Sequence, residues 1–551
     1  MSKVDLLFKN ANVLTLDSRN SRAGSVAVSE GKIIGIWKDA EPSKSELEIT
    51  ARTNVIDLKG ATLIPGFIDT HNHILAYGQM KSQLNCGTPP NRTIHDIVKA
   101  VRAKATETPN GEWIQGYGYD DTLLQEKRHI TRTDLDQAAP NHPVIVMHTS
   151  GHLAAVNSLA LQRGGLTDTV SDPQGGHYGR DEKGCLNGVL YESAAMQSIM
   201  NQLPKMTMDD MVNALGEAAK DYIAQGITTN SDAAIFGIDD FSAHVKAAEK
   251  GVNPMRTQLM IMHHLLREGG VFEGYSAVEL DREIRERSGG MARLDSAKLF
   301  QDGSIQGLTG ALRKPYYQNS EVLGNLVHPQ EVFNEEVADL HQRGFRIATH
   351  GNGDRAIGSI LEAYGYALSK HQRSDHRHRI EHVQTATPED LAKMKELEVA
   401  GSFFINHVYY WGDRHEKIFL GPERASRISP LAEAVKLNLL FTLHSDCPIT
   451  PISPLFSVWA AVNRLTKEGG ILGPEQRIDA MTALKSMTIY GAKLNFAENI
   501  SGSIEIGKQA DFAVLEADPT TVNPEEIKDI SILATYIDGQ PVYGHETIKT
   551  S

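Results

Sequence analysis

The sequence predicts an α/β protein built around a barrel of parallel strands. Three observations support this fold class. Short apolar runs alternate with helical stretches through the middle of the chain, eight such runs follow one another, and β-rich runs occupy both ends. Regular alternation of strand and helix indicates a parallel sheet, and several units in a row favour its closure into a barrel.

Eight apolar runs are expected to be the barrel strands. Two of them follow clear helical stretches, because HPQEVFNEEVADLHQRG precedes FRIATH and PEDLAKMKELE precedes VAGSFFIN. The eight runs are residues 67–73, 226–232, 255–262, 297–302, 345–350, 378–383, 399–406 and 439–446. About 150 residues separate the first two runs, where one strand–helix unit needs about 30–40. We therefore expect an insertion lobe at about 80–220, which would form a lid or a substrate-binding element over one mouth of the barrel.

Both ends of the chain are predicted to build one β-sandwich together. Residues 1–62 contain short β-rich runs with a turn at Glu30-Gly31, and residues 496–551 repeat this style in GSIEIGKQADFAVLEADP and ILATYIDGQPVYG. Asp538-Gly539 is typical of a two-residue hairpin turn. The remaining residues, 63–495, are assigned to the barrel domain and its insertion.

Composition argues against several classes of protein. The 551 residues are too many for one compact core. Lys and Arg total 55 against 69 Asp and Glu, and the formal net charge of -14 makes nucleic acid an improbable partner. Three cysteines without a CxxC pair indicate a reducing compartment. No secretory signal and no apolar run of about 20 residues is seen. We therefore expect a cytoplasmic protein that does not span a membrane.

Polar residues that can bind a metal lie at or near the ends of the predicted strands. In a parallel barrel the carboxyl ends of the strands meet at one rim, so residues far apart in sequence become neighbours there. Imidazole nitrogen and carboxylate oxygen suit zinc or a similar divalent ion. The candidates are His71, His73, Lys298, His350, His382 and Asp446.

Each candidate also has an ordinary structural interpretation. His71 and His73 would be polar residues at a surface turn, and Lys298 would extend from an edge strand into solvent. His350 would cap the following helix, His382 would pair with Glu381 or fill space, and Asp446 would be a helix N-cap or turn acid. All of these interpretations must hold together for the site to disappear, and this coincidence favours the metal hypothesis.

The motifs DTHNH, KLFQDGS, THGNGD, RIEHVQ and LHSDCPITP, in this order, resemble the amidohydrolase superfamily of metal-dependent hydrolases. The segment HTSGHLAAVNS and the KxFxDGS pattern are similar to its YtcJ-like branch, amidohydrolase family 3, which includes N-substituted formamide deformylases. The resemblance covers nearly the whole chain. It implies a distorted TIM (β/α)8 barrel flanked by a β-sandwich, with one or two divalent ions at the barrel mouth.

The resemblance also implies roles for the individual ligands. His71, His73 and Asp446 would hold one ion, His350 and His382 would hold a second, and Lys298 would bridge them as a carboxylated lysine. Zinc is the expected metal. Carboxylation is chemically reasonable, because a buried lysine has a lowered pKa and its neutral amine can add carbon dioxide.

The implied reaction is hydrolysis of an amide-type carbon–nitrogen bond of a small molecule. Zinc would supply hydroxide near neutral pH, and Asp446 would act as general base and then acid. An N-substituted formamide or aryl amide is the first expectation. Deamination or ring opening of a heterocycle is the alternative reaction. The non-enzymatic alternative is an inert barrel that binds a small molecule or a partner protein.

Substrate-binding residues are expected mainly in the insertion. Aromatic walls with a few polar contacts are typical of small-molecule sites, although the aromatic residues would serve equally as lobe core. His444 and Cys447, near Asp446, are assigned to packing, and a homodimer is the default assembly. The substrate-binding candidates are Trp113, Tyr119, Asp120, His152 and Asp302.

Overall fold

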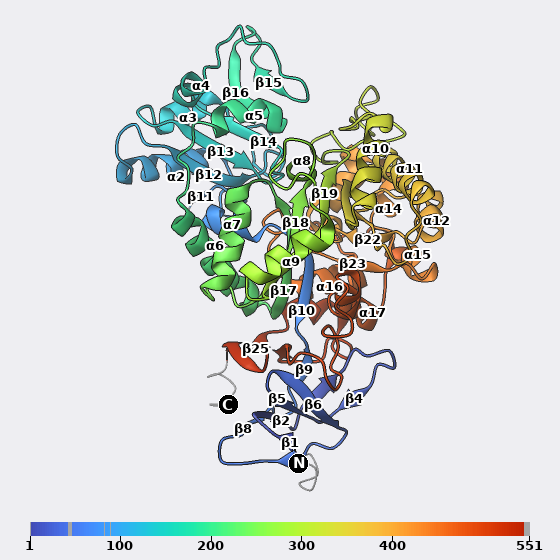
Figure 1. The fold of residues 1–551 in the computed structure, drawn as a ribbon. Helices are drawn as coiled ribbons and strands as arrows, with labels where there is room; N and C mark the ends of the chain where they lie inside the picture. Colours follow the sequence, from blue (N-terminus) through green and yellow to red (C-terminus); the bar gives the residue numbers. More distant parts are fainter. Residues whose placement is uncertain (1, 42–46, 82, 89, 545–551) are drawn as a thin grey trace. The chain divides into compact units, whose positions relative to one another are not determined.

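The protein is described by a computed structural model that covers residues 2–41, 47–81, 83–88 and 90–544 (Figure 1). The chain divides into two compact units, Met1–Leu75 with Leu215–Ser551, and Ala76–Ala214. Each unit has its own sheets. Among the described residues, no helix combines the length and the apolar character needed to cross a bilayer.

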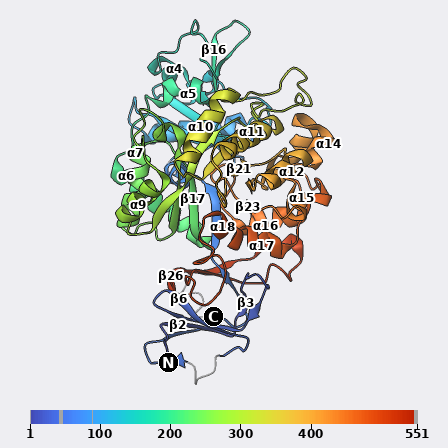
Figure 2. The ribbon, with the colours of Figure 1, turned by 45° about the vertical axis from the view of Figure 1, so that its right-hand side comes forward.

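The centre of the first unit is an eight-stranded sheet in which every neighbouring pair is parallel (Figures 1 and 2). Its strands follow one another in chain order, so the predicted α/β barrel and all eight predicted strands are confirmed. The strands are β10 (Phe67–Asn72), β17 (Ile227–Ile235), β18 (Arg256–Met262), β19 (Ala292–Phe300), β20 (Ile347–Gly351), β21 (Arg379–His382), β22 (Ala400–Phe403) and β23 (Phe441–Leu443).

Helices alternate with these strands and cover the sheet. The helix α12 (Pro388–Glu396) begins with a capping box, in which the side chains of Thr387 and Asp390 each accept a hydrogen bond from the other's backbone N–H, and Pro388 occupies its first turn. In chain order, the helices between and after these strands are α6 (Met208–Ala224), α7 (Ile238–Glu249), α8 (His263–Leu266), α9 (Ala277–Arg287), α10 (Gln330–Gln342), α11 (Asp354–Lys370), α12 (Pro388–Glu396), α13 (His407–Arg414), α14 (Gly421–Ser426), α15 (Leu431–Lys436), α16 (Pro454–Asn463), α17 (Ala480–Ser486) and α18 (Ile489–Leu494).

The first and last barrel strands approach each other, so that the sheet is nearly closed. The hydroxyl of Thr70 on β10 lies 2.8 Å from that of Thr442 on β23. Just beyond the strands, the backbone N–H of Asp446 donates to the carbonyl of His71 at 3.1 Å, and that of His73 donates to Cys447 at 2.7 Å. These contacts bring the end of the eighth strand to the end of the first.

Two further sheets of this unit are built from the chain ends: N-terminal strands alone form the first, and strands from both ends share the second, as the sequence predicts. A four-stranded sheet has the order β6-β5-β2-β8, and a six-stranded sheet has the order β26-β25-β24-β9-β3-β4. Their strands are β2 (Leu6–Lys9), β3 (Asn12–Leu14), β4 (Arg22–Ala23), β5 (Ser25–Ser29), β6 (Lys32–Trp37), β8 (Asn54–Asp57), β9 (Thr62–Pro65), β24 (Phe512–Leu515), β25 (Ile532–Ile537) and β26 (Gln540–Tyr543). The domain boundaries at 62 and 496 stay a prediction.

Turn chemistry explains the hairpins of these sheets. Glu30 and Gly31 both have positive φ and connect β5 to β6, and Asp538 and Gly539 do the same between β25 and β26. Both predicted turns are therefore confirmed. The segment 502–507, which was expected to continue the β-rich pattern, forms turns instead of a strand.

The second unit, Ala76–Ala214, is built on one mixed six-stranded sheet. Its order is β11-β12-β13-β14-β16-β15, with the first three strands parallel and the others antiparallel. The strands are β11 (Leu84–Asn85), β12 (Ile114–Tyr119), β13 (Val144–His148), β14 (Leu153–Val156), β15 (His177–Arg180) and β16 (Leu186–Tyr191). The helices α2 (Ile94–Glu107), α3 (Arg132–Ala138), α4 (Ser158–Arg163) and α5 (Glu192–Met200) accompany them.

The core shared by the terminal sheets gives a stability prediction. Phe512 is fully buried, and its ring centroid lies 5.5 Å from that of Phe8 at the other end of the chain. Phe512→Ala would remove this packing, so we expect it to cost about 3–5 kcal/mol of unfolding free energy. Urea unfolding followed by fluorescence measures this. Val278→Ala on α9, where the side chain is 75% exposed, is the control and should change little. Equal midpoints for both variants would contradict the shared core.

Candidate metal centre

The predicted metal ligands lie at or just beyond the carboxyl-terminal halves of barrel strands in the first unit. Parallel strands present these ends at one rim of the sheet, where the active sites of such barrels gather. His71 belongs to β10 and His73 follows it, Lys298 is on β19, His350 is on β20, His382 ends β21, and Asp446 follows β23.

Distances show that five of these side chains form one cluster. The Oδ1 atom of Asp446 lies 3.2 Å from Nε2 of His73 and 3.4 Å from Nε2 of His71. The ring centroid of His382 lies 4.8 Å from that of His71 and 4.6 Å from that of His350. Ligand atoms of His71, His382 and Asp446 all lie within 4.8 Å of one another. The barrel thus collects imidazoles and a carboxylate that are distant in sequence.

Lys298 supplies a buried amine near the same cluster. Its side chain is 1% exposed, and Nζ has no hydrogen-bond partner among the described residues. Burial lowers the pKa of Lys298 to about 8, while the negative charges of Glu381 and Asp446 act in the opposite direction. A buried amine with a lowered pKa and an unsatisfied nitrogen is chemically suited to carboxylation.

The donor set of this cluster fits a divalent ion. At metal–ligand bonds of about 2.0–2.2 Å, the ligand atoms of a tetrahedral ion lie about 3.3 Å apart. The separations between Asp446 and the two histidine nitrogens are close to this value. Burial raises the pKa of Asp446, but contacts with His71 and His73 outweigh burial and hold this pKa well below its usual range. The carboxylate is therefore anionic at neutral pH.

Three of the histidines have a partner on Nδ1 that fixes the orientation of the ring. A partner on one ring nitrogen leaves the other nitrogen for the metal, and such contacts commonly tune metal affinity. His71 Nδ1 lies 2.6 Å from Glu381, His350 Nδ1 lies 3.0 Å from Asp302, and His382 Nδ1 lies 3.1 Å from His444.

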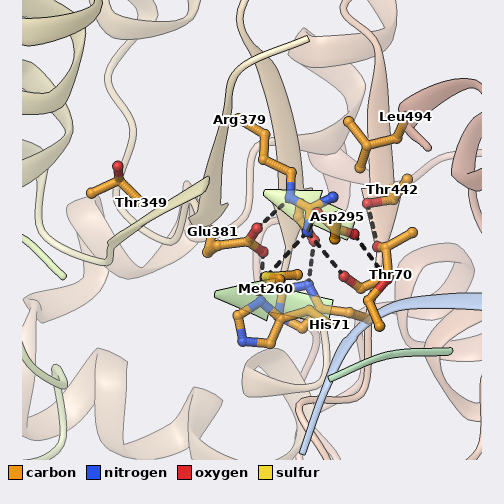
Figure 3. A network of polar contacts seen from close by, with 12 residues as sticks. Thr70, His71, Met260, Asp295, Thr349, Arg379, Glu381, Thr442 and Leu494 are labelled. Atoms are coloured by element: carbon orange, nitrogen blue, oxygen red, sulfur yellow. Dashed lines mark hydrogen bonds and ion pairs between the residues drawn. The ribbon is translucent and has the colours of Figure 1, made fainter. Parts of the chain in front are cut away.

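Glu381 connects His71 to a buried network of charges (Figure 3). Arg379 pairs with Glu381 and lies 3.1 Å from Asp295, which in turn lies 2.7 Å from Arg346. Burial raises the pKa of Glu381, but Arg379 and His71 outweigh this effect and hold the pKa well below its usual range. Two acids and two arginines balance each other, so the charges can remain in the interior. The sequence suggested Glu381 as a partner of His382, whereas the structure pairs it with His71.

Asp302, a predicted substrate contact, lies behind His350. Its Oδ1 accepts the backbone N–H of Asn352 and contacts His350, and its Oδ2 accepts the N–H groups of Gly353 and Ala311 at 2.7 and 3.0 Å. These bonds hold the loop after β20 and orient the imidazole. The predicted contact of Asp302 with substrate stays a prediction.

His444 contacts the cluster although the sequence assigned it to packing. Its Nδ1 lies 2.8 Å from the hydroxyl of Ser402, its Nε2 faces His382, and its ring stacks on His71 at a centroid distance of 4.7 Å. Its position two residues before Asp446 was a usable signal, because residues two apart in an extended chain share a face. Cys447, also assigned to packing, is fully buried.

The remaining predicted substrate residues belong to the second unit. Tyr119 is fully buried, and its hydroxyl lies 3.3 Å from Nδ1 of His129. Asp120 is buried and accepts hydrogen bonds from the N–H and hydroxyl of Thr122. His152 Nδ1 lies 2.8 Å from Glu192, and Trp113 packs against a buried apolar cluster. Their role in binding substrate stays a prediction.

The fold and the cluster agree with what comparison of sequences shows. A profile described as "Amidohydrolase family" matches residues 54–543 of the chain. The protein belongs to the amidohydrolase family, and it is an enzyme that acts on carbon–nitrogen bonds other than peptide bonds.

Individual relatives extend over nearly the whole chain. The N-substituted formamide deformylase of Arthrobacter pascens is 28% identical over 552 residues, which cover 97% of this chain and 97% of that protein. YtcJ of Bacillus subtilis (strain 168) is 27% identical over 543 residues, covering 96% and 98%. A crystal structure of a metal-dependent hydrolase from Pyrococcus furiosus is similar with a TM-score of 0.70 and 23% identity, covering 94% of this chain and 100% of that one. The resemblance to the YtcJ-like branch is confirmed.

The contact between His71 and Glu381 can be tested through metal affinity. Glu381→Gln would weaken the hold on Nδ1 of His71, so we expect metal affinity to fall by about 10- to 100-fold. Competition with a chromophoric chelator measures this. Glu389→Gln on α12, an exposed position, is the matched control. Unchanged affinity in Glu381→Gln would show that the contact does not tune the metal site.

Proposed function

We propose that the protein is a divalent-metal hydrolase that cleaves an amide-type carbon–nitrogen bond of a small molecule. The observation that carries the proposal is the approach of Nε2 of His71 and His73 to one oxygen of Asp446, at 3.4 and 3.2 Å. An N-substituted formamide is the first substrate class, with aryl amides next. The similarity to the Arthrobacter deformylase over 97% of both chains supports this choice.

The ligands divide into two groups in this proposal. His71, His73 and Asp446 would hold one zinc ion, and His350 and His382 would hold a second if two are bound. Lys298 would bridge them as a carboxylated lysine, which is supported by its burial and its unpartnered Nζ in the described structure. When bound, such an ion acidifies a water molecule and polarises a carbonyl oxygen.

Asp446 would move the proton in this reaction. Its carboxylate is anionic at neutral pH, because His71 and His73 hold its pKa well below the usual range. It would accept the proton of the water molecule whose oxygen attacks the carbonyl carbon. It would then return that proton to the nitrogen as the carbon–nitrogen bond breaks. A formamide would thus give formate and the free amine.

The composition of the whole chain supports a small-molecule substrate and a reducing compartment. The net charge of -14 does not favour polyanionic partners. Cys86, Cys185 and Cys447 are all free thiols, as expected in the cytoplasm.

The proton transfer is tested by Asp446→Asn with a substrate panel. The purified zinc-loaded enzyme is offered N-substituted formamides, anilides and cyclic amides, and released formate and ammonia are measured. We expect formate from the formamides, and a loss of about 10²- to 10⁴-fold in kcat for Asp446→Asn. Asp239→Asn, an exposed position on α7, is the control. Full turnover by Asp446→Asn would refute the proton role, and ammonia from a heterocycle would favour deamination over deformylation.

The role of Lys298 is tested by chemical rescue. Lys298→Ala removes the nitrogen that would carry the added carboxylate, so we expect activity to disappear and to return partly with a short carboxylic acid such as acetate or propionate. The control is Lys393→Ala, an exposed position on α12, which should retain activity and show no response to the acid. Carbon-13 NMR of enzyme prepared in labelled bicarbonate checks the modification directly. Full activity of Lys298→Ala without added acid would exclude the bridging role.

A further inference from the structure

A second group of possible metal ligands lies elsewhere in the first unit. His263 begins α8, Glu336 lies on α10, and His328 lies in the segment just before α10. One ligand atom from each lies within 4.8 Å of the other two. The group shares no residue with the cluster around Asp446.

The spacing inside this group is too long for good hydrogen bonds and suits a common ion. His263 Nε2 lies 3.5 Å from one oxygen of Glu336, and His328 Nδ1 lies 3.9 Å from the other. Strong charge-assisted hydrogen bonds of this kind are about 2.7–2.9 Å long. Ligands of a tetrahedral zinc ion are about 3.3 Å apart, so only a small closure would complete the site.

Burial gives these side chains little access to water. Their side chains are only 13% (His263), 18% (His328) and 17% (Glu336) exposed. Within the described part of the chain, the Nε2 atom of His328 has no hydrogen-bond partner. Burial lowers the pKa of His328 and thereby favours the neutral imidazole that a metal binds, and it raises the pKa of Glu336, whose buried carboxylate a bound cation would stabilise.

The neighbouring structure holds the ligands in place. The backbone of His328 exchanges two hydrogen bonds with the side chain of Gln301, at 3.1 Å each. The ring of His328 stacks on Phe333 of α10 with a centroid distance of 5.6 Å. His263 follows Met262, which is paired with Lys298 in the barrel sheet. The group is therefore attached to two neighbouring strands and one covering helix, and it has limited freedom to rearrange.

We propose that His263, His328 and Glu336 bind a zinc ion in addition to any metal held at the barrel mouth. Two neutral imidazoles and one carboxylate form a ligand set that suits zinc, with water completing the coordination. The ion would connect α8 to α10 and to the segment that leads into it. Its expected role is structural, because the group includes none of the residues assigned to the reaction.

One nearby charge opposes this binding and gives a diagnostic variant. The positive charge of Arg267 lowers the pKa of both His328 and Glu336, so it acts on the same group. Removing it should make the site more attractive to a cation. Arg267→Ala is therefore expected to bind zinc at this site more tightly. If Glu336 instead served only as a counter-charge for Arg267, the variant would gain no zinc affinity.

Metal counting on the full-length protein tests the proposal. The zinc-loaded protein is freed of loose metal by gel filtration, and zinc per chain is measured by inductively coupled plasma mass spectrometry. Glu336→Gln and His328→Ala should each hold one zinc ion fewer than the unmodified protein. Glu331→Gln, an exposed position on the same helix, is the control and should retain the full content. Equal zinc content in all four proteins would overturn the proposal.

A second measurement separates loss of the ion from misfolding. Melting temperatures are recorded in excess chelator and after zinc is returned. In chelator, Glu336→Gln should melt close to the unmodified protein, because only an empty ligand group has changed. On return of zinc, its melting temperature should rise less than that of the unmodified protein and of Glu331→Gln. The same rise in all three proteins would also refute the site. Both measurements are independent of the reaction that the enzyme catalyses.

Discussion

The metal centre depends on two backbone hydrogen bonds that join the first and last strands of the barrel. The N–H of Asp446 donates to the carbonyl of His71, and the N–H of His73 donates to that of Cys447. They connect segments more than three hundred residues apart. Because the connection is made by backbone atoms at the rim, it sets the distance between the carboxylate and both imidazoles. The positions of the other histidines follow from the order of the parallel strands.

Buried charge is the second constraint on the centre. A histidine binds a metal through an unprotonated ring nitrogen. Glu381 contacts Nδ1 of His71, which leaves Nε2 of that ring for the metal. An isolated buried carboxylate would be costly, and Arg379 offsets that cost. Asp295 lies against Arg379 and forms a further buried ion pair with Arg346, and the charges of Asp295 and Arg346 cancel. The orientation of the metal ligand His71 therefore depends on buried ion pairs whose charges cancel, and not on apolar packing.

Much of the fold and of the cluster could be predicted from the sequence, because both follow from local patterns. Strand and helix alternate with distinct periods, and ligands such as His350 and His382 occur at strand ends, where a parallel barrel brings side chains together. The partners of these ligands were harder to assign. Glu381 precedes His382 in the chain but contacts His71, since neighbouring residues of a strand point in opposite directions.

The group around Glu336 was missed for a different reason. His263 directly follows the barrel strand β18, but neither His328 nor Glu336 lies on a barrel strand. The neighbours of His263 come from a loop and a helix, where strand alternation gives no guidance. The approach of His263 on α8 and of His328 to Glu336 on α10 arises only in the folded chain. Side-chain direction in loops is decided by tertiary contacts that no short pattern records.

The central claim is that side chains from both ends of the barrel sequence enclose one divalent ion. The most direct measurement is a crystal structure of the zinc-loaded protein with anomalous diffraction recorded on both sides of the zinc absorption edge. The account predicts an anomalous peak within bonding distance of His71, His73 and Asp446. A structure with no peak there, obtained from crystals of fully active enzyme, would contradict it.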